Sequence, residues 1–203
     1  LDHQHILGRT VAAIAAEKAG IIKPNGLLVS AHQHPAACAV LRRVVRTCAA
    51  RAWFAGTDFT ITGVRHCPRG WRFTWHGFGR LMIPFCARVQ LENVSLALQT
   101  GELLRSYFGF RIAPRSLSSV RWPGRMQVVS GRPLMILDGA HNRDAITALA
   151  ATIRERYRRT PFIIVFAVSR DKDYHMLLRT VRTLSARIIV TRYAGRRSAP
   201  VPV

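Results

Sequence analysis

The pattern of apolar and polar positions predicts a mixture of helices and strands in the first half of this chain. Apolar residues recur at helical spacing in three segments, and short apolar or aromatic-rich runs lie between them. The predicted helices are residues 9–19, 36–52 and 88–108, and the predicted strands are 27–31, 53–62, 71–77 and 80–85. We therefore expect an α/β fold.

The second half of the chain has a more regular rhythm. Apolar runs alternate with helical segments in the order strand, helix, strand, helix, strand. The predicted strands end at Leu137, Ser169 and Arg192, and the predicted helices are 143–157 and 173–186. This order predicts a parallel sheet with right-handed crossover connections. A polar stretch with two prolines, residues 113–126, precedes it and reads as a linker or a domain entry.

Composition adds one strong constraint, which is charge. The formal net charge is +21 at pH 7, while 49% of the residues are apolar, enough for a core. Such a charge favours anionic partners, namely nucleic acid, a membrane surface, or phosphorylated or carboxylated small molecules. A general preference for arginine would also explain it.

The cellular setting follows from what the sequence lacks. The four cysteines show no CxxC spacing, so we expect free thiols in a reducing, cytoplasmic compartment. No apolar run is long enough to span a membrane, and we expect neither a signal peptide nor a membrane partner. Both ends of the chain read as cuts through a larger protein.

The sharpest local feature is Asp138-Gly-Ala-His141-Asn142, between a strand end and a helix start. Parallel sheets bind ligands at the carboxyl ends of their strands, and helix N-termini attract phosphate and carboxylate groups. The alternative is that Asn142 or Asp144 simply caps the helix. Polar side chains also follow the next strand, where Asp171 or Asp173 could cap the last helix.

Other candidates carry weaker signals when each is taken alone. Arg125 is presented by the turn Trp-Pro-Gly-Arg-Met, and its planar guanidinium suits phosphate, although a lone arginine is usually a surface residue. His3, with Asp2 and His5, could bind a metal or do nothing. Asn93 is a polar position on an apolar helix, where a satisfied core-edge amide is the alternative.

Lys18 raises a chemical question, because only three of the 31 basic Lys and Arg residues are lysines. An amine can be neutral if it is partly buried, whereas a guanidinium stays charged. A neutral amine can add carbon dioxide, and the resulting carbamate is an anionic oxygen ligand suited to Mg²⁺. The alternative is a lysine favoured by the dipole near a helix C-terminus.

Taken together, the motifs resemble the folylpolyglutamate synthase and dihydrofolate synthase family of the Mur ligase superfamily. The segment DHQHILGRTVAAIAAEKAGIIKPN is similar to the family pattern DHxxxLGxTxxxIAxEKAGIIKxG. AGTDFT, VQLENVSLAL, WPGRMQVV, LDGAHN and SRDKDY are similar to five further family motifs and follow in family order. Arg143 stands where the family has proline, and Val89 stands where it has histidine.

The resemblance implies a role for each matched residue. His3 matches a magnesium ligand, and Lys18 matches the carbamylated lysine that helps to hold a second magnesium ion. Asn93 matches the asparagine that contacts ATP near the adenine. Arg125 matches the arginine that reaches the ATP phosphates. Asp138 matches an acid that contacts the nucleotide, with His141 beside it.

The resemblance also implies a reaction, cofactors and domains. ATP and Mg²⁺ would convert a carboxylate of dihydropteroate or folate into an acyl phosphate, which the amino group of L-glutamate attacks. Residues 1–115 would form the second half of a P-loop-type ATPase domain, 116–126 a linker, and 127–203 a truncated, Rossmann-like, parallel-sheet ligase domain. No segment resembles the family's Gly-rich phosphate loop, so we expect no ligase activity from this chain alone. The full-length protein is expected to be a monomer that binds no nucleic acid.

Two alternatives stay open. One is a different Mur-superfamily amide ligase, against which EKAGIIK and DGAHN argue. The other is a non-catalytic, basic nucleic-acid binder that reuses the fold. It would need a clustered arginine face with stacking aromatic residues, and Trp53, Trp71 and Trp75 read instead as strand residues.

Overall fold

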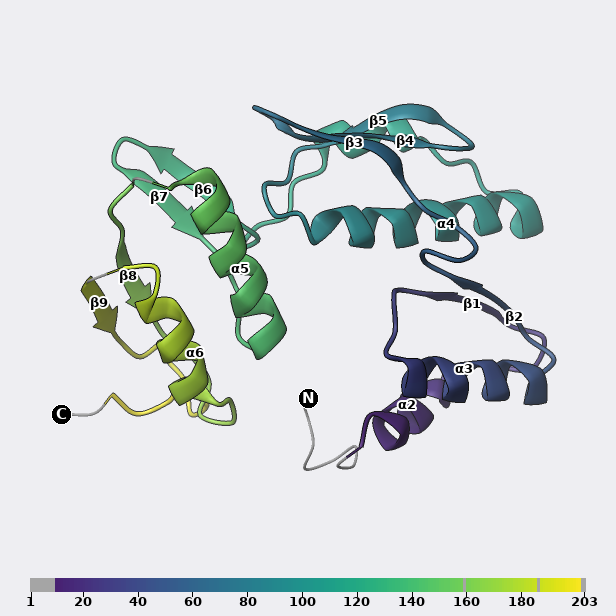
Figure 1. Cartoon of the computed structure of the whole chain (residues 1–203), viewed down its shortest axis with the longest axis horizontal. Helices are drawn as coiled ribbons and strands as arrows, with labels where there is room; N and C mark the ends of the chain where they lie inside the picture. Colours follow the sequence, from purple (N-terminus) through teal and green to yellow (C-terminus); the bar gives the residue numbers. More distant parts are fainter. Residues whose placement is uncertain (1–9, 159, 186, 202–203) are drawn as a thin grey trace. The chain divides into compact units, whose positions relative to one another are not determined.

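The computed structural model describes residues 10–158, 160–185 and 187–201, and its helices and strands form an α/β fold (Figure 1). The chain divides into two compact units. Unit 1 comprises the residues up to 84 and residues 90–119, and unit 2 comprises residues 85–89 and those from 120 onward. No helix in the described part of the chain is long and apolar enough to cross a membrane.

From residue 10 onward, the first elements described in unit 1 are two helices and two parallel strands. They are α2 (Val11–Ala19), β1 (Leu27–Ser30), α3 (Pro35–Thr47) and β2 (Arg51–Phe54), and β1 pairs with β2. Thr10 caps α2 by accepting the Ala13 N–H at 3.1 Å, and Pro35 occupies the first turn of α3. The two helices pack through Ala15, Ala37 and Val40.

The predicted helix 36–52 is wrong in its last part, because α3 ends at Thr47. Ala49 has a left-handed backbone with φ of 48°, which a helix cannot continue. The Asn25 N–H then donates to the Cys48 carbonyl at 2.8 Å, and the Arg51 N–H donates to the Gly26 carbonyl at 2.9 Å. Pairing with β1 therefore turns residues 51–54 into a strand.

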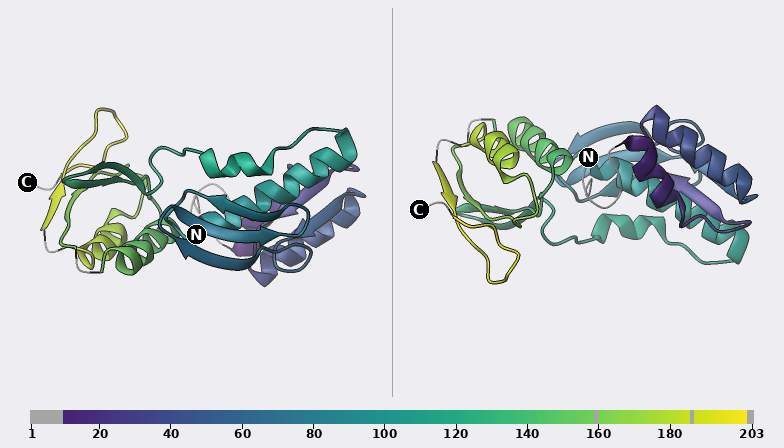
Figure 2. Two further views of the ribbon diagram at one scale, coloured as in Figure 1. Left: turned by 90° about the horizontal axis from the view of Figure 1, so that it is seen from above. Right: turned by 90° about the horizontal axis from the view of Figure 1, so that it is seen from below.

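The rest of unit 1 is an antiparallel sheet against a long helix. Strands β3 (Thr62–Cys67), β4 (Gly70–Trp75) and β5 (Gly79–Ile83) pair in chain order, and α4 (Gln90–Phe108) lies behind one sheet face (Figures 1 and 2). Trp71, Phe73 and Trp75 alternate toward this helix and are at most 4% exposed. The short 3₁₀ helix η1 (Pro114–Ser119) packs beside β5.

The strand predicted over 53–62 is wrong as a single element. The Phe54 N–H donates to Asp58 Oδ2 at 2.7 Å, and this bond closes a turn between β2 and β3. The tryptophan prediction is confirmed, since Trp53 lies in β2 and Trp71 and Trp75 lie in β4.

The described residues of unit 2 form four strands and two helices. They are β6 (Gln127–Gly131), β7 (Leu134–Leu137), α5 (Arg143–Arg156), β8 (Ile163–Phe166), α6 (Tyr174–Arg182) and β9 (Arg187–Val190). Its core cluster comprises Ile146, Phe166, Val168, Leu177, Val181 and Ala199. Asn142 caps α5 and Asp173 caps α6, each through its side chain, so the capping alternatives for these two residues are confirmed.

The strand–helix rhythm of unit 2 is confirmed, but its sheet differs from the prediction in one respect. β8 and β9 pair in parallel, as a crossover through α6 requires. Among the described residues, β7 pairs with β6 in an antiparallel hairpin, and it is not part of the β8–β9 sheet. The sequence pattern predicts all three apolar runs in one parallel sheet and does not predict β6.

Candidate functional site

The side chain of Asp138 joins two loops in unit 2. Its Oδ2 accepts the Met126 N–H and its Oδ1 accepts the Ala140 N–H, both at 2.8 Å. The Gly139 N–H also donates to the Gly124 carbonyl at 2.8 Å. Two short hydrogen bonds, from Met126 to Asp138 and from Gly139 to Gly124, therefore hold the loop before β6 and the loop after β7 together at the open end of the hairpin, and the third lies within the loop after β7.

Arg125 sits at the tip of the first of these loops. Gly124 and Met126 have positive φ angles of 71° and 48°, which makes the turn tight, and Met126 is only 4% exposed. Arg125 itself is exposed. Met126 therefore anchors the turn while the arginine side chain projects from it.

The guanidinium of Arg125 lies over Gly139. A Cβ atom added at Gly139 would be 2.8 Å from Arg125 Nη1, closer than real Cβ contacts. Across residues 10–158, 160–185 and 187–201, no ion pair with a carboxylate involves Arg125. The guanidinium is thus positioned by the loop and keeps its charge for an external anion.

His141 and Asn142 continue the second loop into α5. His141 Nδ1 is 2.8 Å from the Gly139 carbonyl oxygen. Because a carbonyl only accepts, the Nδ1–H group donates in this contact, and the ring is exposed. Asn142 Oδ1 accepts the Ala145 N–H at 2.9 Å, which starts α5. The structure thus brings Arg125, Asp138 and His141 into one loop cluster of unit 2.

Asn93 lies in unit 1, in the first turns of α4. It is exposed, and its Nδ2 donates to Gln90 Oε1 at 2.9 Å. The preceding residue, Glu92, accepts the His32 backbone N–H at 3.0 Å and contacts His32 Nδ1 at 2.8 Å. His32 follows β1, so α4 and the carboxyl end of the β1–β2 sheet meet at this pair.

His32 and Glu92 were not singled out from the sequence. Gly56, after β2, lies against the His32 ring, since a Cβ atom at Gly56 would overlap it. A polar residue directly after an apolar strand was the available signal for His32, as it was for Asp138. Nothing local in the sequence linked His32 to Glu92, which lies 60 residues away.

Lys18 is in the last turn of α2 and is exposed. This position fits the alternative of a lysine favoured by the helix dipole. His3 lies outside the described residues. All four cysteines are free thiols, as expected from their spacing.

The chain is similar in sequence to known proteins, and these similarities identify its family. Residues 124–201 match the Mur ligase, glutamate ligase domain family. The chain is 31% identical over 182 residues to the folylpolyglutamate synthase of Lacticaseibacillus casei, covering 86% of the chain and 42% of that protein. It is 30% identical over 192 residues to the dihydrofolate synthase/folylpolyglutamate synthase of Bacillus subtilis, covering 91% of the chain and 45% of that protein.

The chain belongs to the folylpolyglutamate and dihydrofolate synthase family. A solved FPGS–AMPPCP–folate complex matches it with a TM-score of 0.85 and 29% identity, over 97% of this chain and 50% of that one. Mycobacterium tuberculosis folylpolyglutamate synthase complexed with ADP matches it with a TM-score of 0.84 and 25% identity, over 95% and 45%. The chain spans about half the length of the relatives it matches.

Of the two expected Mg²⁺ ligands of this family member, Lys18 lies among the described residues and His3 lies outside them. Within the described ranges, no three His, Cys, Asp or Glu side chains are grouped so that they could hold a metal ion. Lys18 and its sequence neighbour Glu17 are both exposed. The expected Mg²⁺ ligands His3 and Lys18 therefore stay a prediction.

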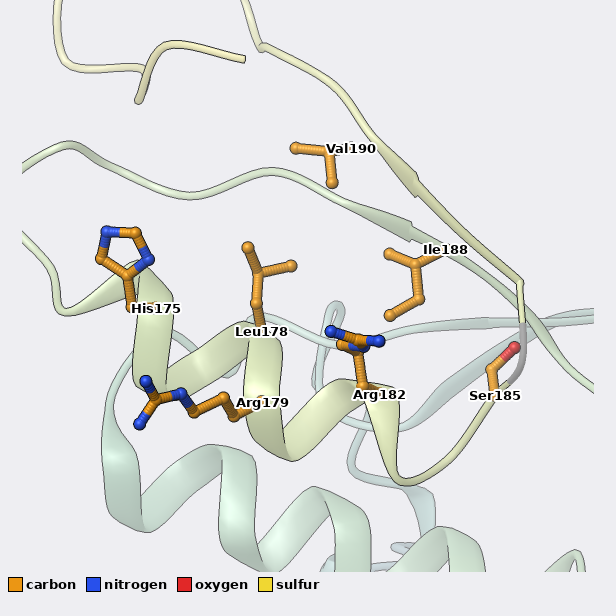
Figure 3. Close-up of a pocket in the computed structure, with 7 residues that line it drawn as sticks. All are labelled: His175, Leu178, Arg179, Arg182, Ser185, Ile188 and Val190. Carbon is orange, nitrogen blue, oxygen red and sulfur yellow. The ribbon is translucent and has the colours of Figure 1, made fainter. Parts of the chain in front are cut away.

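Unit 2 has a second surface feature, a pocket of about 400 Å³ between α6 and β9 (Figure 3). Leu178, Ile188 and Val190 form its apolar wall, and Arg182 reaches across it toward Ile188 (Figure 3). None of the residues of the Arg125 loop cluster lines it. Nothing in the described structure shows what covers this wall.

Proposed function

We propose that this chain supplies part of an ATP-dependent ligase that joins L-glutamate to dihydropteroate or a folate. Membership of the family, the printed names of its relatives, and the AMPPCP, ADP and folate complexes of solved relatives support this proposal. The observation that carries it is the exposed Arg125 guanidinium, held over Gly139 by a turn that Asp138 fastens.

The proposed reaction has two steps. The γ-phosphoryl group of ATP passes to a substrate carboxylate, giving an acyl phosphate and ADP. The amino group of glutamate then attacks the acyl carbon, the amide forms, and phosphate leaves. Arg125 donates its planar fork of N–H groups to phosphoryl oxygens and stabilises the charge that develops on them.

Asp138 acts through Arg125 in this proposal. Both of its carboxylate oxygens already accept backbone N–H groups, one from each loop. It is therefore a positioning residue that fixes the arginine turn, rather than the direct nucleotide contact that the resemblance implies. His141 extends the same loop at the start of α5, where the helix dipole favours an anion.

The remaining assignments are proposed on the family resemblance. Asn93 contacts ATP near the adenine, and Lys18 carries a carbamate that holds Mg²⁺ together with His3. The domain boundaries stay at 1–115, 116–126 and 127–203. The partners are small molecules, with no nucleic acid and no membrane, and the complete protein is a cytoplasmic monomer.

Nucleotide binding tests the proposal directly. AMPPCP is titrated into the purified chain by calorimetry, and Arg125→Ala is expected to weaken binding about tenfold or more through the loss of a charge-assisted bidentate contact. Arg132→Ala is the matched control, because Arg132 lies in the turn at the other end of the same hairpin. Equal affinity of the wild type and Arg125→Ala would contradict the role of Arg125.

Catalysis is measured separately. The chain is incubated with ATP, Mg²⁺, dihydropteroate and glutamate, and amide formation is followed by mass spectrometry. We expect no turnover from this chain alone, because none of its segments resembles the family's phosphate loop. Turnover would show that the described residues suffice and would overturn that expectation.

A further inference from the structure

The face of the β3–β5 sheet that points away from α4 has an unusual composition. Trp71, Phe73 and Trp75 of β4 turn toward the helix, so the residues between them turn outward. Arg72 is one of these and is exposed, and Thr74 is the other. The same alternation in β5 buries Leu81 and Ile83 and exposes Arg80.

The register places like charges against each other on this face. Arg65 of β3 is directly opposite Arg72 of β4, and Thr74 of β4 is opposite Arg80 of β5. Two like charges directly opposite in an antiparallel pair destabilise it. A neighbouring carboxylate would offset this cost.

No carboxylate does so among the described residues, where no ion pair involves Arg65, Arg72 or Arg80. The reason is visible in the sequence. Residues 59–91, which contain all three strands, include no Asp or Glu, and neither do residues 103–137, which contain η1. The ten acidic residues of the chain all lie elsewhere.

The short helix η1 completes a groove on this face. It packs beside β5 and contributes Arg115 and Ser118 to the lining. The groove has a volume of about 750 Å³ and lies entirely within unit 1. Its polar lining consists of four arginines and two hydroxyl residues, Arg65, Arg72, Arg80, Arg115, Thr74 and Ser118, and its remaining lining residues are Gly63, Phe73, Leu81 and Met82.

We infer that this groove binds a linear polyanion, a ligand with several phosphate or carboxylate groups along an extended chain. Guanidinium groups bind both kinds of anion bidentately. The Thr74 hydroxyl adds a neutral donor, whereas the Ser118 hydroxyl already donates to the Arg115 carbonyl at 3.0 Å. Trp71 and Trp75 of β4 face the core, and Phe73, which also lines the groove, is only 2% exposed, so the groove offers no stacking surface for nucleic-acid bases. The groove itself is inferred from residues of unit 1 and does not depend on the proposed function. Only the identification of its ligand as a γ-linked glutamate chain would rest on the proposed function.

Two probes separate the possible sources of the anion. Inorganic tripolyphosphate and γ-linked triglutamate are each titrated into the chain by calorimetry at two salt concentrations. The double variant Arg72→Gln/Arg80→Gln is expected to bind the preferred probe about tenfold more weakly than wild type. The control Arg43→Gln/Arg46→Gln removes the same charge from exposed positions of α3 and is expected to change affinity less than twofold.

The outcomes divide clearly. Tighter binding of triglutamate identifies the glutamate chain, tighter binding of tripolyphosphate identifies a phosphate ligand, and both support the groove. Equal weakening in the two double variants would show only diffuse attraction to a basic protein and would overturn the inference. A single-stranded oligonucleotide that binds more tightly than both probes and displaces them would overturn it in favour of a nucleic-acid surface.

Two further variants keep the test decisive. If circular dichroism shows that Arg72→Gln/Arg80→Gln is unfolded, Arg115→Gln is used instead, because Arg115 lies in η1 and outside the strand pairs. Arg115→Gln is expected to lower the affinity for the probe about threefold. Arg125→Ala is expected to leave groove binding unchanged. If Arg125→Ala loses AMPPCP binding but still binds the polyanion probe, the inference about the groove stands.

Discussion

Each unit of the molecule uses a carboxylate to fasten a loop at a strand end, but the two carboxylates come from different distances along the chain. In unit 2, Asp138 accepts N–H groups from Met126 and Ala140, which are 12 and 2 residues away. In unit 1, Glu92 accepts the N–H of His32, 60 residues away.

The surroundings of the two carboxylates differ as well. Asp138 receives two backbone donors, one on each oxygen, at the base of a hairpin. Glu92 uses one oxygen for both contacts, and the His32 side chain is 70% exposed. Water competes with the contact between Glu92 and the exposed His32 ring. We therefore expect the Asp138 loops of unit 2 to be held more firmly than the His32 loop of unit 1.

The largest expected effect is that of Asp138→Ala. Removing the acceptor of two buried or half-buried N–H groups should lower the stability of the loop cluster by about 2–4 kcal/mol. Hydrogen exchange of residues 124–142 measures it locally. Asp144→Ala, an exposed residue in the first turn of α5, is the control and should cost less than about 1 kcal/mol. Equal protection of residues 124–142 in the two variants would show that the Asp138 carboxylate does not hold these loops together, and the contrast with Glu92 in unit 1 would be lost.

Glu92→Ala should have a smaller effect. Because the His32 side chain is exposed, the loss should be about 1 kcal/mol or less, measured by exchange of the loop after β1. A loss equal to that of Asp138→Ala would reverse the comparison.

Gly139→Ala should separate stability from binding. The new methyl group would displace the Arg125 guanidinium, the mobile end of a flexible side chain, so stability should change by less than about 1 kcal/mol. Affinity for AMPPCP should fall about threefold to tenfold, as calorimetry would show. Gly131→Ala is the matched control, because a Cβ atom there meets nothing within 4 Å. A fall of equal size in the control would mean that crowding of Arg125 is not the cause.

The smallest expected effect concerns pH. Burial, and then the charge of Cys86, raise the pKa of Tyr157 above its usual value of about 10, while Arg156 opposes the shift. The neutral phenol is favoured in the folded protein, so its contribution to stability is complete below about pH 10 and is lost as pH rises beyond it. Urea unfolding of the wild type should therefore weaken more steeply there than that of Tyr157→Phe. Identical slopes in the two proteins would contradict the assignment.

Much of the fold could be predicted because its signals are local. The apolar periodicity gave α4 within two residues at its start, and the small-residue helix α2 ended at Gly20 as expected. Strand β3 was missed because its sequence, with glycine, arginine and histidine, does not alternate clearly. Its place is set by pairing with β4, which periodicity cannot show.

The candidate site was predictable to a similar degree. Arg125, Asp138 and His141 were each singled out from turn and strand-end patterns. The hydrogen bond from Met126 to Asp138, which makes them one cluster, depends on the hairpin register, and β6 had not been predicted. The pairing of Arg65 with Arg72 depends on register in the same way.

The central claim is that Arg125, held over Gly139, binds the phosphates of ATP. The measurement that tests it most directly is a double-mutant cycle of AMPPCP affinity over the wild type, Arg125→Ala, Gly139→Ala and the double variant. We predict that Gly139→Ala weakens binding only while Arg125 is present, so that the double variant binds like Arg125→Ala. Additive effects, or full affinity in Arg125→Ala, would contradict the claim.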